Sequence, residues 1–165
     1  MRTLLLFPLM MALSLIPPEQ ARGCTAFFLK SGKQMVLAKN LDWPVDLGYV
    51  IYTPAGKKKQ AFFADGPAHP FQWTAQYSTL TFNQFGVGFP LGGMNSQGLV
   101  VEELNMPRVT IKKDTTSRQL NEFQTVQFLL DYCANVEEVV KQLNRLHYAP
   151  LLLHLHYFVA DQTGK

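Results

Sequence analysis

The sequence predicts an α+β fold, because a first part rich in short strand patterns is followed by two helix patterns and a last strand. Hydrophobic residues make up 47% of the 165 residues and charged residues 16%, which is enough apolar surface for the compact core of one globular domain. The net charge of +3 is small and scattered. Because nucleic-acid-binding proteins present a strongly basic face, no nucleic acid partner is expected.

The first 23 residues have the pattern of a secretory signal peptide. Arg2 supplies a positive charge, residues 4–16 form an apolar core, and a short polar stretch ends in Gly23. This core is too short to span a bilayer comfortably, and cleavage after Gly23 would make Cys24 the first residue of a mature chain 24–165. Two alternatives remain open: Cys24 lies one or two residues inside the mature chain, or it is the acylated cysteine of a lipoprotein. We expect a secreted or periplasmic protein with no membrane segment after cleavage.

Strand patterns dominate the chain up to residue 104. Three lysines, Lys57 to Lys59, follow a Pro-Ala-Gly turn and are expected in a solvated loop. Residues 61–97 hold many aromatic residues between glycines and prolines, which indicates short strands and loops around a surface or pocket. The other expected elements are a hairpin with strands 24–29 and 34–40 around a turn at 30–33, a third strand near 49–53, and a β-type run at 98–104.

Two helices are expected after residue 115. Thr116 or Ser117 can cap the first, and Asn135 with Glu138 forms a capping-box-like start for the second. The spacing of three and four residues predicts two buried faces: Leu120, Phe123, Val126, Leu130 and Cys133 in the first helix, and Val139, Val140, Leu143 and Leu146 in the second. Cys133 is thus a core residue, and a last strand is expected at 153–160, followed by a turn.

The start of the mature chain brings together residues suited to nucleophilic chemistry. If Ser31 and Gly32 form a two-residue turn, Cys24 lies opposite Lys39 on the hairpin. A cation about 5 Å away at Cβ favours the thiolate of Cys24. Asp42, just beyond the second strand, is within reach of the new α-amino group.

A free α-amine can act as the base for its own thiol. Its unperturbed pKa, near 7.7 to 8.0, leaves it substantially neutral close to physiological pH, so it can accept the thiol proton. Taken singly, Cys24 is better explained as a small buried residue that begins a strand, and Asp42 as a turn residue. Together with a signal cleavage that exposes the cysteine, they favour the interpretation of Cys24 as a nucleophile.

Three ordered motifs resemble the choloylglycine hydrolase family of linear-amide hydrolases, which includes bile salt hydrolases and penicillin V acylases. The motifs are residues 24–28 (CTAFF), residues 39–43 (KNLDW) and residues 92–101 (GGMNSQGLVV), and the likeness extends from Cys24 to the end of the chain. The resemblance implies an N-terminal nucleophile hydrolase fold, an αββα sandwich of two antiparallel sheets between helical layers. It also implies a small-molecule acyl amide as substrate, with no cofactor and no metal.

The resemblance assigns roles to residues that match the motifs. Cys24 corresponds to the nucleophile, Asp42 to the aspartate that holds its amine, and Asn95 to an asparagine that donates to the oxyanion. Without the resemblance, Asn95 is better explained as a turn residue. Lys39 falls where bile salt hydrolases have an arginine. It keeps the positive charge but lacks the planar guanidinium group that can form two parallel hydrogen bonds. Asn83, Gln84 and Trp43 are candidates for lining the substrate pocket, and a polar loop or plain core packing accounts for them equally well.

The chain departs from the family in its length. Family members continue well beyond this point and supply further active-site residues, so an incomplete sandwich is expected here. Two hypotheses follow: a cysteine amidase that works through a thioester, or a catalytically inactive truncated remnant or binding module of the same fold. A homo-oligomer in the full-length form is compatible with both. The residues do not choose between a conjugated bile salt, penicillin V, an acyl homoserine lactone and another acyl amide.

Overall fold

The computed structural model describes residues 23–63, 70–106 and 119–165. The expected signal peptide, except for Gly23, and the expected helix caps Thr116 and Ser117 lie outside the described residues. In the described residues no helix is long and apolar enough to cross a membrane.

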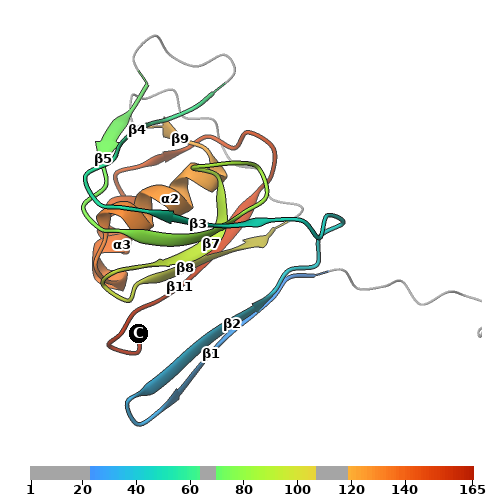
Figure 1. The fold of residues 1–165 in the computed structure, drawn as a ribbon, viewed down its shortest axis with the longest axis vertical. Coiled ribbons are helices and arrows are strands. Elements are labelled where there is room, and N and C mark those ends of the chain that lie inside the picture. Colours follow the sequence, from blue (N-terminus) through green and yellow to red (C-terminus); the bar gives the residue numbers. More distant parts are fainter. Residues whose placement is uncertain (1–22, 64–69, 107–118) are drawn as a thin grey trace, which may run out of the picture.

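A five-stranded antiparallel sheet forms the centre of the fold (Figure 1). Its strand order is β11-β8-β7-β6-β3, so β8 and β7 lie inside the sheet and β3 and β11 at its edges. The bounds are β3 (Tyr49–Thr53), β6 (Thr79–Asn83), β7 (Pro90–Asn95), β8 (Val100–Asn105) and β11 (Leu155–Ala160). Strand 49–53 is confirmed, and the expected strands 98–104 and 153–160 each begin two residues later in the structure.

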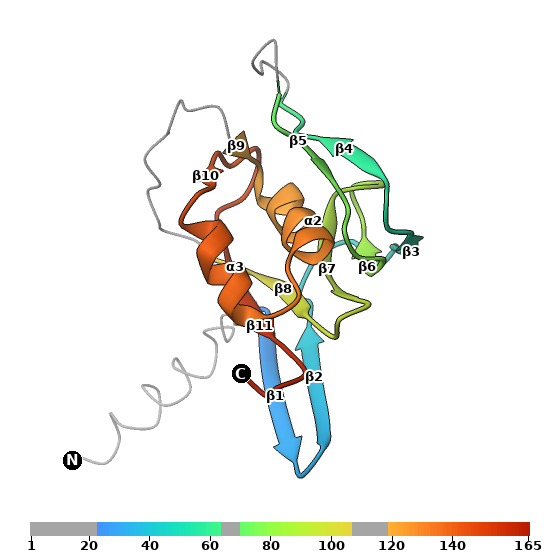
Figure 2. The same cartoon turned by 90° about the vertical axis from the view of Figure 1, so that its left-hand side faces the viewer.

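Two helices cover one face of this sheet (Figure 2). Helix α2 (Glu122–Tyr132) packs its apolar side chains on β7 and β8, and buried residues such as Val101, Val126 and Leu129 form the core between the two layers. Cys133 is fully buried in this core, as predicted. Burial raises the pKa of its thiol to about 12, so Cys133 stays protonated.

The helix boundaries differ in part from expectation. Helix α2 begins after Asn121, whose side chain accepts a hydrogen bond from the Gln124 N–H at 2.8 Å. The expected earlier start is wrong because Leu120 belongs to strand β9 (Gln119–Leu120), which pairs in parallel with β10 (His147–Tyr148). Helix α3 (Val136–Leu143) has the predicted cap, Asn135.

Helix α3 buries less of its apolar side than predicted. Val139 is buried, but Val140 is 54% and Leu143 38% exposed. Both residues were expected to face inward. The spacing identified an amphipathic helix correctly, and the packing of the helix against its neighbours decided how much of that face is covered.

The hairpin of β1 (Thr25–Ser31) and β2 (Gln34–Asn40) lies on the opposite side of the sheet from the helices (Figures 1 and 2). It forms a second, two-stranded sheet. The predicted register is wrong: Ser31 pairs with Gln34, so the turn is Gly32-Lys33, and Lys39 pairs with Ala26 instead of Cys24. Gly32 has φ +59°, the left-handed conformation that the first position of a type I′ turn requires.

The predicted solvated loop of lysines is also wrong in part. Residues Lys58–Gln60 form strand β4, which pairs with β5 (Gln72–Thr74). The Lys59 ammonium lies 2.9 Å from the carboxylate of Asp131, which is fully buried on α2. Trp73 Nε1 and Gln127 Nε2 donate to the same carboxylate at 2.7 and 3.0 Å. Burial raises the pKa of Asp131, and Lys59 and these donors oppose that effect.

Candidate active site

Cys24 lies at the base of the hairpin, half-buried and with a free thiol. It lines a small cavity of about 20 Å³ where the hairpin meets the end of the five-stranded sheet. The wall is mostly apolar, and its polar side chains come from Glu103 and Asn105 on β8. The lining residues are Cys24, Leu41, Trp43, Phe85, Leu91, Glu103, Asn105, Leu153 and Leu155.

Asp42 lies beside the backbone N–H of Gly23, the residue before Cys24. Its Oδ2 accepts a hydrogen bond from the Gly23 backbone N–H at 3.2 Å, and its Oδ1 accepts one from Asn40 Nδ2 at 2.9 Å. The carboxylate is therefore held in place by Asn40. It reaches to within one residue of the nitrogen that would become the α-amine of Cys24.

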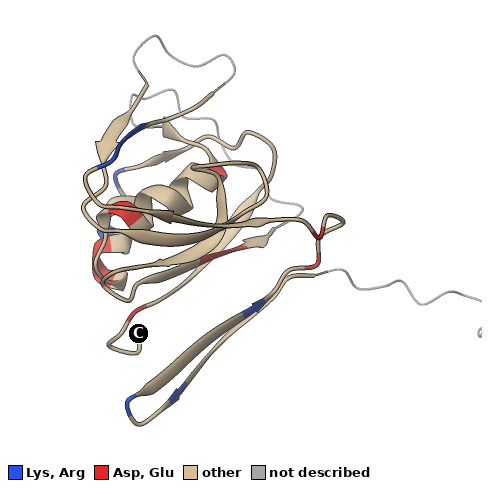
Figure 3. Cartoon of the chain, viewed as in Figure 1, with Lys and Arg blue, Asp and Glu red and all other residues tan. Residues whose placement is uncertain are grey.

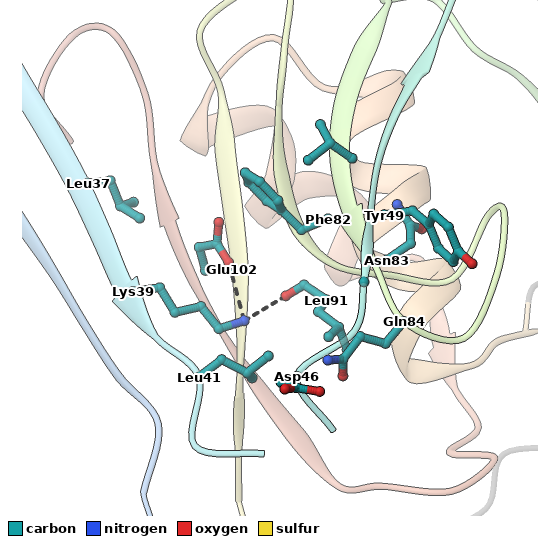
Figure 4. A pocket seen from close by; sticks show the side chains of 12 residues that line it. Leu37, Lys39, Leu41, Asp46, Tyr49, Phe82, Asn83, Gln84, Leu91 and Glu102 are labelled. Carbon is teal, nitrogen blue, oxygen red and sulfur yellow. Dashed lines mark hydrogen bonds and ion pairs between the residues drawn. The ribbon is translucent and has the colours of Figure 1, made fainter. Parts of the chain in front are cut away.

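Lys39 does not face the thiol as predicted. Its ammonium lies 3.3 Å from Glu102 Oε2 and donates to the Leu91 carbonyl at 2.8 Å, so the cation joins the hairpin to β7 and β8 (Figure 4). Figure 3 shows an acidic stretch on β8 and a basic position on β2, the two strands that carry this ion pair. Because β1 and β2 are offset from the predicted register, Cys24 is diagonal to Lys39 on the same hairpin face.

A glycine makes room for the Lys39–Glu102 ion pair. Gly92 pairs with Glu102 across β7 and β8, and a Cβ at position 92 would overlap the Glu102 carboxylate. Burial raises the pKa of Glu102, while the Lys39 charge and hydrogen bond lower it. A buried carboxylate of this kind is stable only with its partner in place.

Both amide hydrogens of Asn95 are used in hydrogen bonds within the fold. Its Nδ2 donates to the carbonyls of Leu130 and Cys133 at 2.9 and 2.7 Å. Its Oδ1 accepts from the backbone N–H groups of Gln97 and Leu99 at 3.0 and 3.1 Å. Asn95 also lies four residues along β7 from Leu91 on the cavity wall, about 13 Å at the rise of an extended strand. The structure therefore supports the turn-residue interpretation and does not place Asn95 as an oxyanion donor.

The three candidates for substrate contacts divide between two cavities. Trp43 lines the Cys24 cavity and packs edge-on against Phe85, with ring centroids 6.3 Å apart. Asn83 and Gln84 instead line a larger cavity of about 550 Å³ between the hairpin and the sheet (Figure 4). Their amide nitrogens donate to Thr81 Oγ1 and the Val45 carbonyl at 2.8 and 2.7 Å. Leu41 and Leu91 line both cavities, so the two adjoin.

The sequence interpretation missed Glu103 and Asn105. The sequence did contain a signal for a buried carboxyl group. Because adjacent residues of a strand point to opposite faces, Glu102 and Glu103 must place one carboxyl on each side of the sheet. Glu102 meets Lys39 on the hairpin side. Glu103 is 4% exposed, and burial raises its pKa to about 8, with Glu122 and Glu102 adding to the effect and Lys39 opposing it.

The sheet with helices on one face and the hairpin on the other defines the class of fold: an α+β fold of the N-terminal nucleophile hydrolase type, of which this chain has a part. Solved structures agree with this. Penicillin V acylase from Agrobacterium tumefaciens superposes with a TM-score of 0.69 at 22% sequence identity, covering 86% of this chain and 44% of that one. A mutant of conjugated bile acid hydrolase from Clostridium perfringens gives a TM-score of 0.69 at 20% identity, covering 87% of this chain and 46% of that one.

The particular family follows from the sequence. Residues 24–165 match the family described as linear amide C-N hydrolases, choloylglycine hydrolase family, and the chain belongs to this family. No curated protein matches the sequence. The chain spans less than half the length of the two solved structures.

The four hydrogen bonds of Asn95 predict a loss of stability in Asn95→Ala. The substitution leaves two buried carbonyls and two N–H groups without their partner, and we expect the free energy of unfolding to fall by about 2–4 kcal/mol. Urea denaturation followed by circular dichroism measures this. Asn144→Ala, at an exposed position after α3, is the control and should change stability little. An Asn95→Ala protein of unchanged stability would contradict the structural role.

The burial of Glu103 predicts that stability depends on pH. The folded protein holds the Glu103 proton up to about pH 8, whereas the ordinary glutamate pKa is 4.5, so this residue lowers stability as pH rises from about 4.5 to 8. Glu103→Gln removes that contribution. We expect its stability relative to the wild type to increase over this range, by up to several kcal/mol at about 1.4 kcal/mol per pKa unit. Urea denaturation at a series of pH values tests this. If the free energies of unfolding of wild type and Glu103→Gln change with pH in parallel, the prediction is contradicted.

Proposed function

We propose that the protein, once its leader is removed before Cys24, hydrolyses linear amides with the Cys24 thiol as nucleophile and its α-amine as base. The amine takes the thiol proton, and the sulfur attacks the amide carbonyl carbon. The C–N bond then breaks, the amine leaving group takes the proton, and a thioester remains on Cys24. Water hydrolyses the thioester to the free acid and restores the thiol.

The observation that carries this proposal is the hydrogen bond from the Gly23 N–H to Asp42. The Asp42 carboxylate, already bound to the Gly23 N–H, needs to move by no more than about one residue, 3.8 Å between Cα atoms, to hold a new ammonium or amine at Cys24. In that position it orients the amine toward the thiol of the same residue. The family match of residues 24–165, which begins at Cys24, supports the same role.

Asn105 is our candidate for the oxyanion donor. It lines the Cys24 cavity from the end of β8, and, in contrast to Asn95, no hydrogen bond to other described residues occupies its side-chain amide. An amide donor aimed at a developing oxyanion contributes about 2.7–4 kcal/mol in other acyl-transfer enzymes.

Lys39 has a positioning role in this scheme. Its ion pair with Glu102 and its hydrogen bond to the Leu91 carbonyl hold the hairpin, and so Cys24, against the sheet.

The proposed substrate is a small acyl amide with an apolar acyl group. Leu41 and Leu91 line both the small Cys24 cavity and the adjoining cavity of about 550 Å³, so an apolar acyl group attached to Cys24 has room in the larger cavity. The two solved relatives are described as a penicillin V acylase and a conjugated bile acid hydrolase, and both descriptions fit this class. The signal-peptide pattern supports a secreted or periplasmic location.

One observation favours the second hypothesis, a catalytically inactive remnant or binding module. The hairpin covers only part of the sheet, and apolar side chains on that side stay exposed, among them Val50, Leu80, Phe82 and Met94. An exposed apolar surface of this kind marks an interface or a missing layer. A remnant would bind without forming a thioester, which the experiments below detect.

The first prediction of this proposal concerns the mature terminus. Protein exported from a suitable host should begin at Cys24 with a free amine, because the mechanism uses that amine as base. Intact-mass measurement and N-terminal sequencing of the exported chain test this. A different first residue, or a lipid on Cys24, would overturn the amine-base mechanism.

The second prediction concerns acylation. The mature chain should form a Cys24 thioester with an activated acyl amide, detected as an added acyl mass, and Cys24→Ala should form none. Asn105→Ala should slow thioester formation by about 10²–10³-fold if Asn105 stabilises the oxyanion. Asn144→Ala, exposed beyond α3, is the matched asparagine control and should keep the wild-type rate.

The two hypotheses give different results in this experiment. A cooperatively folding wild-type chain that forms no thioester would support the remnant or binding module. Thioester formation at an unchanged rate in Asn105→Ala would leave the nucleophile in place and remove Asn105 from the oxyanion site.

A further inference from the structure

Three glutamates are buried around the end of β8, and they differ in their partners. Glu102 is paired with Lys39. Glu122, at the start of α2, accepts backbone N–H groups from Leu151, Leu152 and Leu153, all at 2.7 Å. Glu103 is as buried as these two, but its Oε2 has no hydrogen-bond partner among the described residues. Because a buried carboxyl oxygen without a partner costs free energy, this position is open to a water molecule or a proton.

Glu103 lines the cavity that holds the Cys24 side chain. The volume of about 20 Å³ exceeds the roughly 10–15 Å³ that one water molecule needs, and is far too small for an acyl group. A buried water also needs two or more polar partners, and the wall offers Glu103, Asn105 and the Cys24 thiol. The cavity thus has the size and the chemistry for a single water beside the sulfur.

The groups packed around Glu103 keep it protonatable near neutral pH. Glu102 and Glu122 are its acidic neighbours on β8 and α2, and Lys39 on β2 is the opposing cation. Tyr148 on β10 and Tyr157 on β11 also interact with it electrostatically, Tyr157 as its direct partner across the sheet. Burial raises the pKa of Glu103 to about 8, which is the range that suits a general base working near pH 7–8.

We propose that Glu103 is the general base of thioester hydrolysis, holding the water in the Cys24 cavity and taking its proton. This rests on the proposed function. The water oxygen forms a bond to the thioester carbonyl carbon while Glu103 accepts one proton from the water. When the tetrahedral intermediate collapses, the C–S bond breaks and the Cys24 thiolate leaves. Glu103 returns the proton to the sulfur, so the acid is released and both side chains are restored. The α-amine of Cys24 then serves the acylation step, and Glu103 the deacylation step.

The test separates deacylation from acylation. The mature chain is acylated with p-nitrophenyl phenylacetate, an activated ester whose p-nitrophenolate leaves without needing a proton. The decay of the acyl-enzyme is then followed by mass spectrometry. Glu103→Gln keeps the shape and can hold a water but cannot take its proton, so its thioester should decay about 100-fold or more slowly. The wild-type decay rate should rise with pH as Glu103 ionises toward pH 8, and Glu103→Gln should lose that rise.

Glu137→Gln, which removes an exposed carboxylate on α3, is the matched control and should decay at the wild-type rate. A Glu103→Gln thioester that decays as fast as the wild type, or that keeps the full pH dependence, would overturn the proposal and leave the α-amine as the base. No thioester on wild-type Cys24 would instead overturn the proposed function itself, so the two failures are distinguishable.

A structural measurement gives a second, activity-independent readout. A crystal structure of the mature chain should show one ordered water within hydrogen-bond distance of Glu103 and near Cys24. Glu103→Leu, an apolar residue of similar size, should fold and lose that water. A dry cavity in the wild-type crystal would overturn the proposal whatever the kinetics.

Discussion

The ion pair between Lys39 and Glu102 is the interaction on which the arrangement of the two sheets depends. Lys39 belongs to the hairpin and Glu102 to a central strand, and the ammonium also binds the Leu91 carbonyl on the next strand. The cost of burying these charges is met only when hairpin and sheet are together. Since Cys24 begins the same hairpin, this contact also fixes where the thiol lies. Gly92 makes the ion pair possible, because a side chain at this position would displace the Glu102 carboxylate.

Most buried polar side chains near the helix layer have complete sets of partners. Asp131 binds Lys59, Trp73 and Gln127, and Asn95 ties the β7–β8 turn to the end of α2. Glu103 differs from these, since its Oε2 has no partner among the described residues and lies beside the Cys24 cavity, as Asn83 Oδ1 and Gln84 Oε1 have none beside the larger cavity. Buried groups that stabilise a fold are satisfied, whereas a group that must exchange a proton with water or substrate needs a free position.

The partial second sheet relates the chain to its longer relatives. The chain spans 44% and 46% of the two solved structures, and in the described residues the two-stranded hairpin is the layer that faces the five-stranded sheet opposite the helices. The cavity of about 550 Å³ under the hairpin, with the exposed apolar residues beside it, lies between the two layers. We therefore interpret it as space between sheets, and the small cavity at Cys24 as the site of chemistry.

The sequence by itself determined the α+β class, the hairpin, the N-cap Asn135 of α3 and the candidate nucleophile Cys24. These depend on periodicity, turn residues and motifs that are local in the chain. It also determined the family, through three ordered motifs. The tertiary structure decided what depends on contacts between distant segments. A shift of the turn to Gly32-Lys33 moved Lys39 from Cys24 to Ala26, and packing on α2 engaged the amide of Asn95. Only the fold brought Glu103 and Asn105, some 80 residues from Cys24 in the chain, to the wall of its cavity, because sequence spacing carries no information on which strand ends meet.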